Sequence, residues 1–421
     1  MQKFILDNGL NIYYHSIRSA QSVSVDLFVK VGSRYENLSN NGVAHMLEHM
    51  HFRQLGKMDQ SEIYFKIEEM GNSLGATTYK ELTHFFIKTR YKNLIRSLEF
   101  FKEIFLTYEW TQEHLEAEKQ VVLNQISLRD SYPDFDIYVN DLLWGKNSLA
   151  FPVAGTKGVI EELSLEELVE FKRQYYCTDN MYMIISGCLA EEDINYINSI
   201  FSKIPIPAIK EPVNLSVPQQ KNSKVMFVKD GAKYLDVSIS FVVDYKTASL
   251  EELIMLSSIL GGGDGAKLCL ELRERLGITS NIYSDVTSYH DIAVLEITMN
   301  IHKVYLSKGL SEILNVLNEC KSNISKKDMA INIPFYTDNL WYWLEDPCQL
   351  NEKIGWEIAL KASPSLTIEN KISIYQNIKE ERLMDVAKDI FRSKNASVVI
   401  AGMIGKLTQK EIKSIVKALD D

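Results

Sequence analysis

His45-Met46-Leu47-Glu48-His49 is the stretch from which the organisation of this chain is most readily understood. On an α-helix, residues 45 and 49 lie one turn apart on the same face, and Glu48 shares that face because it follows His45 by three positions. Two neutral imidazoles can hold one Zn²⁺, and a carboxylate beside them can accept a proton from an activated water. The spacing therefore predicts a helical zinc site in which Glu48 is a general base.

The residues around the pentapeptide weigh against the alternative, which is a pair of surface histidines on an amphipathic helix. The stretch is apolar nearly all round, as expected for a buried helix. The apolar positions are Val43, Ala44, Met46, Leu47, Met50 and Phe52. Buried imidazoles need polar partners, and a metal ion supplies one. His51 falls outside the pair, and we expect it to pack in the core or to support the site.

Composition and charge exclude several other classes of protein. The chain has 421 residues, of which 46% are hydrophobic and 24% charged, as in an ordinary soluble protein of two or more domains. The net charge of −10 argues against a nucleic-acid partner. No apolar run is long enough to span a membrane, and residues 1–8 lack the apolar segment of a signal peptide. The five scattered cysteines form no C-x-x-C pair, which favours a reducing cytoplasm.

The periodicity of apolar residues predicts alternating strands and helices in the first half of the chain. Residues 22–30 alternate as a half-buried strand does, and 83–89 and 181–186 also read as strands. Four helices are expected besides the one that carries the histidines. They cover residues 59–70, 93–105, 113–129 and 164–176, and two of them begin at the capping residues Asp59 and Ser164.

A change of composition divides the chain. Residues 204–223 contain four prolines and no regular pattern, so we expect an N-terminal metal-binding domain over 1–204, a linker over 205–222 and a C-terminal domain over 223–421. Strand-then-helix periodicity returns at 237–243 and 250–260, without a second histidine pair. This weak repeat predicts an α+β fold of two related halves, each with a mostly antiparallel sheet packed against helices.

A third ligand is needed because catalytic zinc usually has three protein ligands and one open position. We expect an acidic side chain from another helix. The predicted helix 113–129 offers Glu113, Glu116 and Glu118, with Gln125 two turns beyond Glu118 on the same face.

Taken together, these features resemble the pitrilysin/insulysin family of metallopeptidases, whose zinc motif is the inverted H-x-x-E-H. The resemblance is to the branch that includes mitochondrial processing peptidase and its bacterial relatives, and it covers nearly the whole chain. Besides the pentapeptide, it rests on residues 71–78, 118–125 and 176–187 in the first half, and on Leu260-Gly261-Gly262 and Leu272-Arg273-Glu274 in the second.

The resemblance implies a role for each of several residues. His45 and His49 would bind zinc, Glu48 would be the general base and Glu118 would support the site. The third ligand, normally glutamate, falls on Gln125. Gly75 and Ala76 would lie on an edge strand that pairs with an extended peptide substrate, and Arg273 would help to bind that substrate.

This sequence departs from the family pattern at three positions. Gln125 offers a neutral amide oxygen, a poorer zinc ligand than a carboxylate, which predicts a weaker metal site unless Glu118 also coordinates. Gly75 stands where asparagine is usual, although glycine can still pair through its backbone. The tyrosine expected seven residues after Arg273 is replaced by Ser280, and Tyr283 lies three residues further on.

The sequence thus predicts a zinc-dependent endopeptidase, or the catalytic subunit of a heterodimeric one, that cleaves short or unfolded peptides. The family implies a second homologous chain closing over the site, as a homodimer or heterodimer. The alternative is a non-catalytic or weakly active partner subunit that binds substrate or acts as a scaffold. Gln125 and Ser280 favour this alternative, and the intact His45, Glu48 and His49 oppose it.

Overall fold

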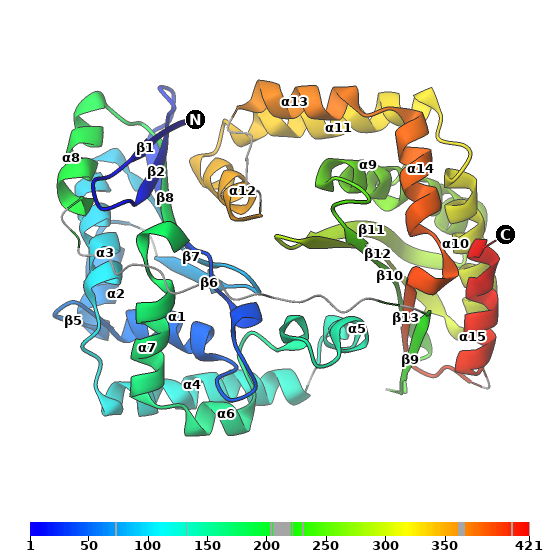
Figure 1. The fold of residues 1–421 in the computed structure, drawn as a ribbon, viewed down its shortest axis with the longest axis horizontal. Helices are drawn as coiled ribbons and strands as arrows, with labels where there is room; N and C mark the ends of the chain where they lie inside the picture. Colours follow the sequence, from blue (N-terminus) through cyan, green and yellow to red (C-terminus); the bar gives the residue numbers. More distant parts are fainter. Residues whose placement is uncertain are drawn as a thin grey trace. The chain divides into compact units, whose positions relative to one another are not determined.

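The computed structural model describes residues 1–71, 74–131, 133–202, 204, 220, 222–229, 231–360, 367–405 and 407–420. The chain forms two compact units (Figure 1). Unit 1 comprises 1–133, 147–216 and 341–367, and unit 2 comprises 134–146, 217–340 and 368–421. Two segments therefore belong to a different unit from their neighbours in sequence. The linker expected at 205–222 lies outside the described residues except for 220 and 222, so that boundary stays a prediction.

Unit 1 is built on a six-stranded sheet in the order β1-β2-β8-β3-β7-β6. The pairs are antiparallel except for β2 and β8, which run parallel. The strands are β1 (Gln2–Ile5), β2 (Asn11–Ser16), β3 (Ser22–Val29), β6 (Gly75–Thr78), β7 (Thr83–Arg90) and β8 (Met181–Gly187). Strand β6 ends the sheet and so has a strand neighbour on one side only among the described residues.

Eight helices belong to the described part of unit 1. They are α1 (Val43–Arg53), α2 (Gln60–Glu69), α3 (Leu94–Leu106), α4 (Gln112–Ser131), α6 (Lys157–Glu162), α7 (Leu165–Tyr175), α8 (Glu191–Phe201) and α12 (Pro347–Leu360). A short hairpin, β4 (Gln54–Leu55) and β5 (Met58–Asp59), joins α1 to α2. The helices predicted from periodicity are all present, and Asp59 and Ser164 begin α2 and α7 with capping boxes as expected.

The prediction of a half-buried strand at residues 22–30 is wrong in one respect. The alternation of β3 predicts a half-buried strand, yet every residue after Ser22 is buried. Helix α12, which follows some 320 residues later in sequence, packs on the face of β3 and β8 that alternation leaves to solvent. There Leu350 and Ile354 meet Phe28 and Ile184 in a second apolar cluster. A strand covered on both faces is buried throughout, and its own sequence does not reveal the distant helix.

Unit 2 repeats the same plan. Its sheet has the order β11-β12-β10-β13-β9, and its only parallel pair among the described strands is β13 with β9. The strands are β9 (Lys224–Val228), β10 (Tyr234–Asp244), β11 (Thr279–Ser288), β12 (Ile292–His302) and β13 (Ala396–Ala401). The helices are α5 (Phe135–Trp144), α9 (Leu250–Gly261), α10 (Leu306–Cys320), α11 (Lys326–Trp343), α13 (Ile368–Asn377), α14 (Glu380–Ile390) and α15 (Gln409–Val416).

The two sheets correspond strand by strand, which confirms the predicted repeat and the mostly antiparallel α+β fold. Strands β2-β8-β3-β7-β6 of unit 1 match β9-β13-β10-β12-β11 of unit 2, each with one parallel pair in the same place. Helix α1 follows β3 as α9 follows β10. The histidine pair therefore occupies a position in unit 1 whose counterpart in unit 2 carries no histidines.

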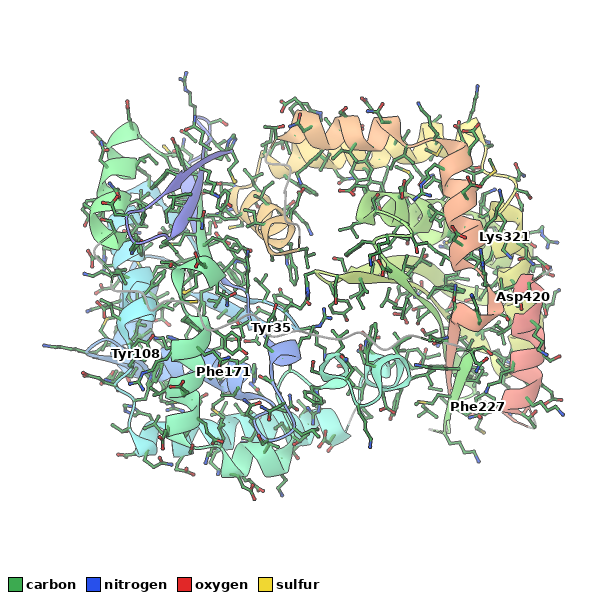
Figure 2. The ribbon with its side chains drawn as sticks, in the orientation of Figure 1. Tyr35, Tyr108, Phe171, Phe227, Lys321 and Asp420 are labelled. Carbon is green, nitrogen blue, oxygen red and sulfur yellow. The ribbon has the colours of Figure 1, made fainter. Side chains whose placement is uncertain are left out.

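Contacts outside the sheets secure the C-terminal end of unit 2. Figure 2 labels Lys321, at the end of α10, and Asp420. The Lys321 ammonium donates to the carbonyl of Leu419, and the Asp420 carboxylate accepts from the Ser393 backbone at 2.9 Å. Across the described residues, no helix is both long and apolar enough to cross a lipid bilayer. All five cysteines are free of disulfide bonds.

Candidate metal centre

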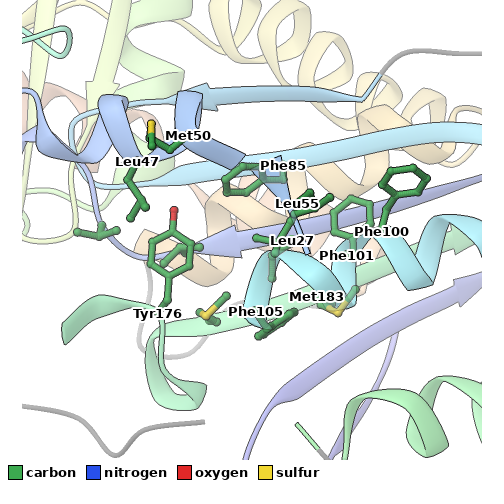
Figure 3. Close-up of a cluster of buried hydrophobic side chains, with 14 of the residues drawn as sticks. Leu27, Leu47, Met50, Leu55, Phe85, Phe100, Phe101, Phe105, Tyr176 and Met183 are labelled. Atoms are coloured by element: carbon green, nitrogen blue, oxygen red, sulfur yellow. The ribbon is translucent and has the colours of Figure 1, made fainter. Parts of the chain in front are cut away.

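Helix α1 is held in the core of unit 1 by its apolar side chains. Met46, Leu47 and Met50 are fully buried. Figure 3 shows Leu47 and Met50 beside Phe85 of β7 in a cluster of buried side chains. Burying a side chain of this size contributes about 1.5–3 kcal/mol to folding. The prediction of a buried helix is correct, and the burial gives the histidines of α1 a rigid support.

The two histidines of the pentapeptide converge. Their Nε2 atoms lie 3.2 Å apart, and the ring centroids are separated by 4.5 Å. Two nitrogens bound tetrahedrally to zinc, each about 2.0–2.1 Å from the ion, would be about 3.3 Å apart. The spacing of the imidazoles thus fits a shared zinc ion without rearrangement of the helix.

The protonation of His45 also suits a metal ligand. Burial, reinforced by the neighbouring His49, lowers the pKa of His45 to about 3, despite the opposing charge of Glu118. The imidazole is therefore neutral at physiological pH, which is the state that binds a metal. Its Nδ1 atom is buried and has no hydrogen-bond partner among the described residues.

His49 is oriented by a residue of α4. The Glu118 carboxylate accepts from His49 Nδ1 at 2.7 Å, which leaves the Nε2 lone pair directed at the shared position. The other carboxylate oxygen of Glu118 accepts from Arg53 Nε at 2.7 Å, and Arg53 also donates to Gln60. Although burial alone would raise the pKa of Glu118, these bonds hold it below its usual value. Arg53 was not anticipated from the sequence, because only folding brings it to Glu118.

Glu48 lies on the same helix and contacts strand β6. Its carboxylate accepts from the Thr78 hydroxyl at 2.5 Å, and the glutamate is only 8% exposed. Burial raises the pKa of Glu48 and outweighs the opposing effects of Thr78 and His49. A carboxylate whose pKa is raised is a stronger base, which suits a group that takes a proton from water. Thr78 is a second residue that sequence reasoning missed, because its link to Glu48 spans 30 positions.

Strand β6 brings the predicted substrate-pairing residues beside this helix. Gly75 and Ala76 pair with Phe86 and Phe85 of β7, and the opposite edge of β6 carries no strand among the described residues. Helix α1 contacts β6 directly. A Cβ at residue 75 would collide with the Phe86 ring as it lies, so a larger residue here would require that ring to shift.

The remaining predicted site residues are placed less directly. Gln125 is exposed on α4, two turns after Glu118. Arg273 belongs to unit 2, where its exposed guanidinium pairs with Asp264 at 2.7 Å and Glu274 at 3.2 Å. His51 is a packing residue. Its buried ring donates from Nδ1 to the Leu47 carbonyl at 2.7 Å and lies among Phe85, Trp110 and Tyr176.

Comparison with known proteins places these features in a family. The family model for insulinase (peptidase family M16) matches residues 12–157, and that for the peptidase M16 inactive domain matches residues 162–332. An uncharacterised zinc protease of Bacillus subtilis is 25% identical over 95% of this chain and 98% of its own length. One of Rickettsia bellii is 26% identical over 94% and 96%.

Solved structures share the fold. A protease from Helicobacter pylori superimposes with a TM-score of 0.85 and 22% identity, covering 95% of this chain and 98% of its own. A peptidase M16 inactive domain protein from Pseudomonas fluorescens gives the same TM-score and coverage with 17% identity. The two family models together match about three quarters of the sequence, and each falls largely on one of the two repeats. This chain belongs to peptidase family M16.

Proposed function

We propose that this protein is a zinc-dependent endopeptidase, or the catalytic subunit of a heterodimeric one, that cleaves short or unfolded peptides. The observation that carries the proposal is the convergence of His45 and His49 at 3.2 Å beside the buried carboxylate of Glu48. The zinc proteases among its relatives support the same class of reaction.

The substrate would bind as an extended strand. Its backbone would pair with the open edge of β6 at Gly75 and Ala76, which favours a segment free of its own fold. Because Thr78 ends β6 and contacts Glu48, the scissile bond would be presented close to the general base. Arg273 remains a predicted contact to substrate from unit 2.

The residues of unit 1 would divide the chemistry among them. His45 and His49 would hold zinc, which when bound supplies a Lewis acid for the scissile carbonyl and for the attacking water. Glu48, held at one oxygen by Thr78, would take the proton from the attacking water at its other oxygen and pass it to the leaving amine. Glu118 would keep His49 in the tautomer that binds metal.

Removal of the metal tests this proposal. We expect the purified chain to hydrolyse a short unfolded peptide, to lose that activity on treatment with a chelator and to regain it when zinc is added. The assay is peptide cleavage measured together with metal content. Stoichiometric zinc without cleavage would instead favour the non-catalytic partner subunit, for which Gln125 and Ser280 argue. Adding a homologous M16 chain would then show whether the missing groups come from a second subunit.

The variant Gln125→Glu tests the predicted third ligand. We expect zinc affinity to rise by about 10–100-fold, because a carboxylate adds the negative charge and stronger donor that an amide lacks. Competition with a chromophoric chelator measures the change. Gln120→Glu is the matched control, since it adds the same charge at another exposed position of α4. Equal affinities for the two variants would rule out position 125 as a ligand.

A further inference from the structure

The N-cap residue of helix α1 has no side chain that could accept a hydrogen bond from the first turn. Gly42 occupies the N-cap position with φ of 102°, a conformation that favours glycine, and a Cβ there would collide with Ile160 and Gly155. The first backbone N–H groups of a helix have no partner within the helix, and a side chain at the N-cap usually accepts from one of them. In α1 that acceptor has to come from elsewhere.

Glu36 supplies it. One carboxylate oxygen accepts from the Gly42 N–H at 2.7 Å and from the Asn41 amide at 2.7 Å, and the other accepts from the Ala44 N–H at 2.9 Å. The side chain is 5% exposed. Asn41 in turn donates to the carbonyl of Pro152, which fixes the start of the helix to the loop before α6. The carboxylate therefore defines where the first turn of α1 lies.

His45 lies in that first turn, and it depends on the turn more than His49 does. His49 is oriented by its own bond to Glu118, whereas His45 Nδ1 has no hydrogen-bond partner among the described residues. The direction of the His45 ring is set by the backbone beneath it and by packing. We infer that Glu36 is a positioning residue of the metal centre, which holds the first turn of α1 so that His45 Nε2 meets His49 Nε2. The inference rests on the proposed zinc site.

The electrostatics of Glu36 support such a role. Burial raises the pKa of Glu36 to about 7, against the lowering effects of the hydrogen bonds from Gly42, Ala44 and Asn41 and of the Lys80 charge. Tyr175 of α7 also faces this carboxylate. A carboxyl with a raised pKa in the folded state favours folding most below its ordinary value of 4.5, and this contribution is lost as the pH rises to about 7. The hold of Glu36 on the first turn of α1 is thus expected to depend on pH between about 4.5 and 7.

Substitution of Glu36 in the full-length chain tests the inference. Glu36→Gln keeps the shape but turns an NH₂ group toward helix N–H groups, and Glu36→Ala removes the acceptor. We expect both to weaken zinc binding by about tenfold or more, the range seen when a supporting group around a metal is lost. Ser164→Ala is the matched control, because it removes the side-chain cap of α7 in the same unit and bears no ligand. It should lower thermal stability yet leave zinc affinity within about twofold.

A second measurement separates this inference from the proposed function. Hydrogen exchange followed by mass spectrometry should be faster in Glu36→Gln across residues 41–46 and unchanged in α7. Wild-type zinc affinity in a folded Glu36→Gln would overturn the inference. If the wild-type chain binds no zinc, the proposed function fails. In that case, faster exchange confined to 41–46 would still support Glu36 as the residue that fixes α1, and unchanged exchange would refute it.

Discussion

Replacing Glu48 with glutamine is expected to lower kcat/KM for an unfolded peptide by about 10²–10⁴-fold, the usual contribution of a general base. The amide has the same shape and can accept the Thr78 hydroxyl bond, but it cannot take a proton. Folding should not suffer, because the substitution removes a desolvated carboxylate whose pKa burial raises. Zinc content should stay at the wild-type level, since His45 and His49 are unchanged.

The measurement compares cleavage, zinc content and thermal midpoint for Glu48→Gln and for Glu113→Gln. The second variant neutralises an exposed carboxylate of α4 and should behave as wild type. If Glu48→Gln kept more than a tenth of the activity, Glu48 would not be the general base. A wild-type chain that binds zinc but cleaves no peptide would favour the alternative of a non-catalytic partner subunit.

Replacing Asn351 with leucine is expected to destabilise unit 1 by about 3 kcal/mol, or roughly 150-fold in its folding equilibrium. The fully buried Asn351 amide of α12 donates to Asp26 Oδ1 at 2.7 Å, to the Ser24 carbonyl at 3.2 Å and to the Ile184 carbonyl at 3.1 Å. Leucine would leave these acceptors buried without that donor. Among the described residues, the Asp26 carboxylate would keep its bonds to Ser24 and His84.

Urea denaturation combined with hydrogen exchange measures this effect. A chain of two units can unfold in more than one transition, so exchange in β3, β8 and α12 identifies the transition that belongs to unit 1. Asn377→Leu is the control. Its exposed amide contacts only Ser373 of the same helix among the described residues, and we expect a change below about 0.5 kcal/mol. A similarly small change for Asn351→Leu would show that α12 is held by its apolar contacts alone.

The features that could be predicted from the sequence are those that depend on neighbours within a turn or two. The convergence of His45 and His49 follows from helical spacing, and the capping boxes at Asp59 and Ser164 follow from residues three apart. The link between His49 and Glu118 was expected only through the family resemblance. The geometry agrees with it, since Glu118 accepts from His49 Nδ1.

Contacts between distant segments escaped sequence reasoning. The full burial of β3 depends on α12. This helix belongs to unit 1, although in sequence it follows most of the residues of unit 2. No role was predicted for Thr78, Arg53 or Glu36, and each gains its role from a partner that folding brings within hydrogen-bond distance. Segment 134–146 belongs to unit 2 for the same kind of reason, because α5 packs on β9 and β13.

By itself the sequence determined the pair of imidazoles, the carboxylate between them and the twofold repeat of strand and helix. These are consequences of helical and strand periodicity, which are local properties of the backbone. Only the tertiary structure decided what orients those groups. Glu118 holds one imidazole, Glu36 holds the turn beneath the other, and Thr78 holds the carboxylate. Buried polar groups require partners, and packing of the whole unit selects them.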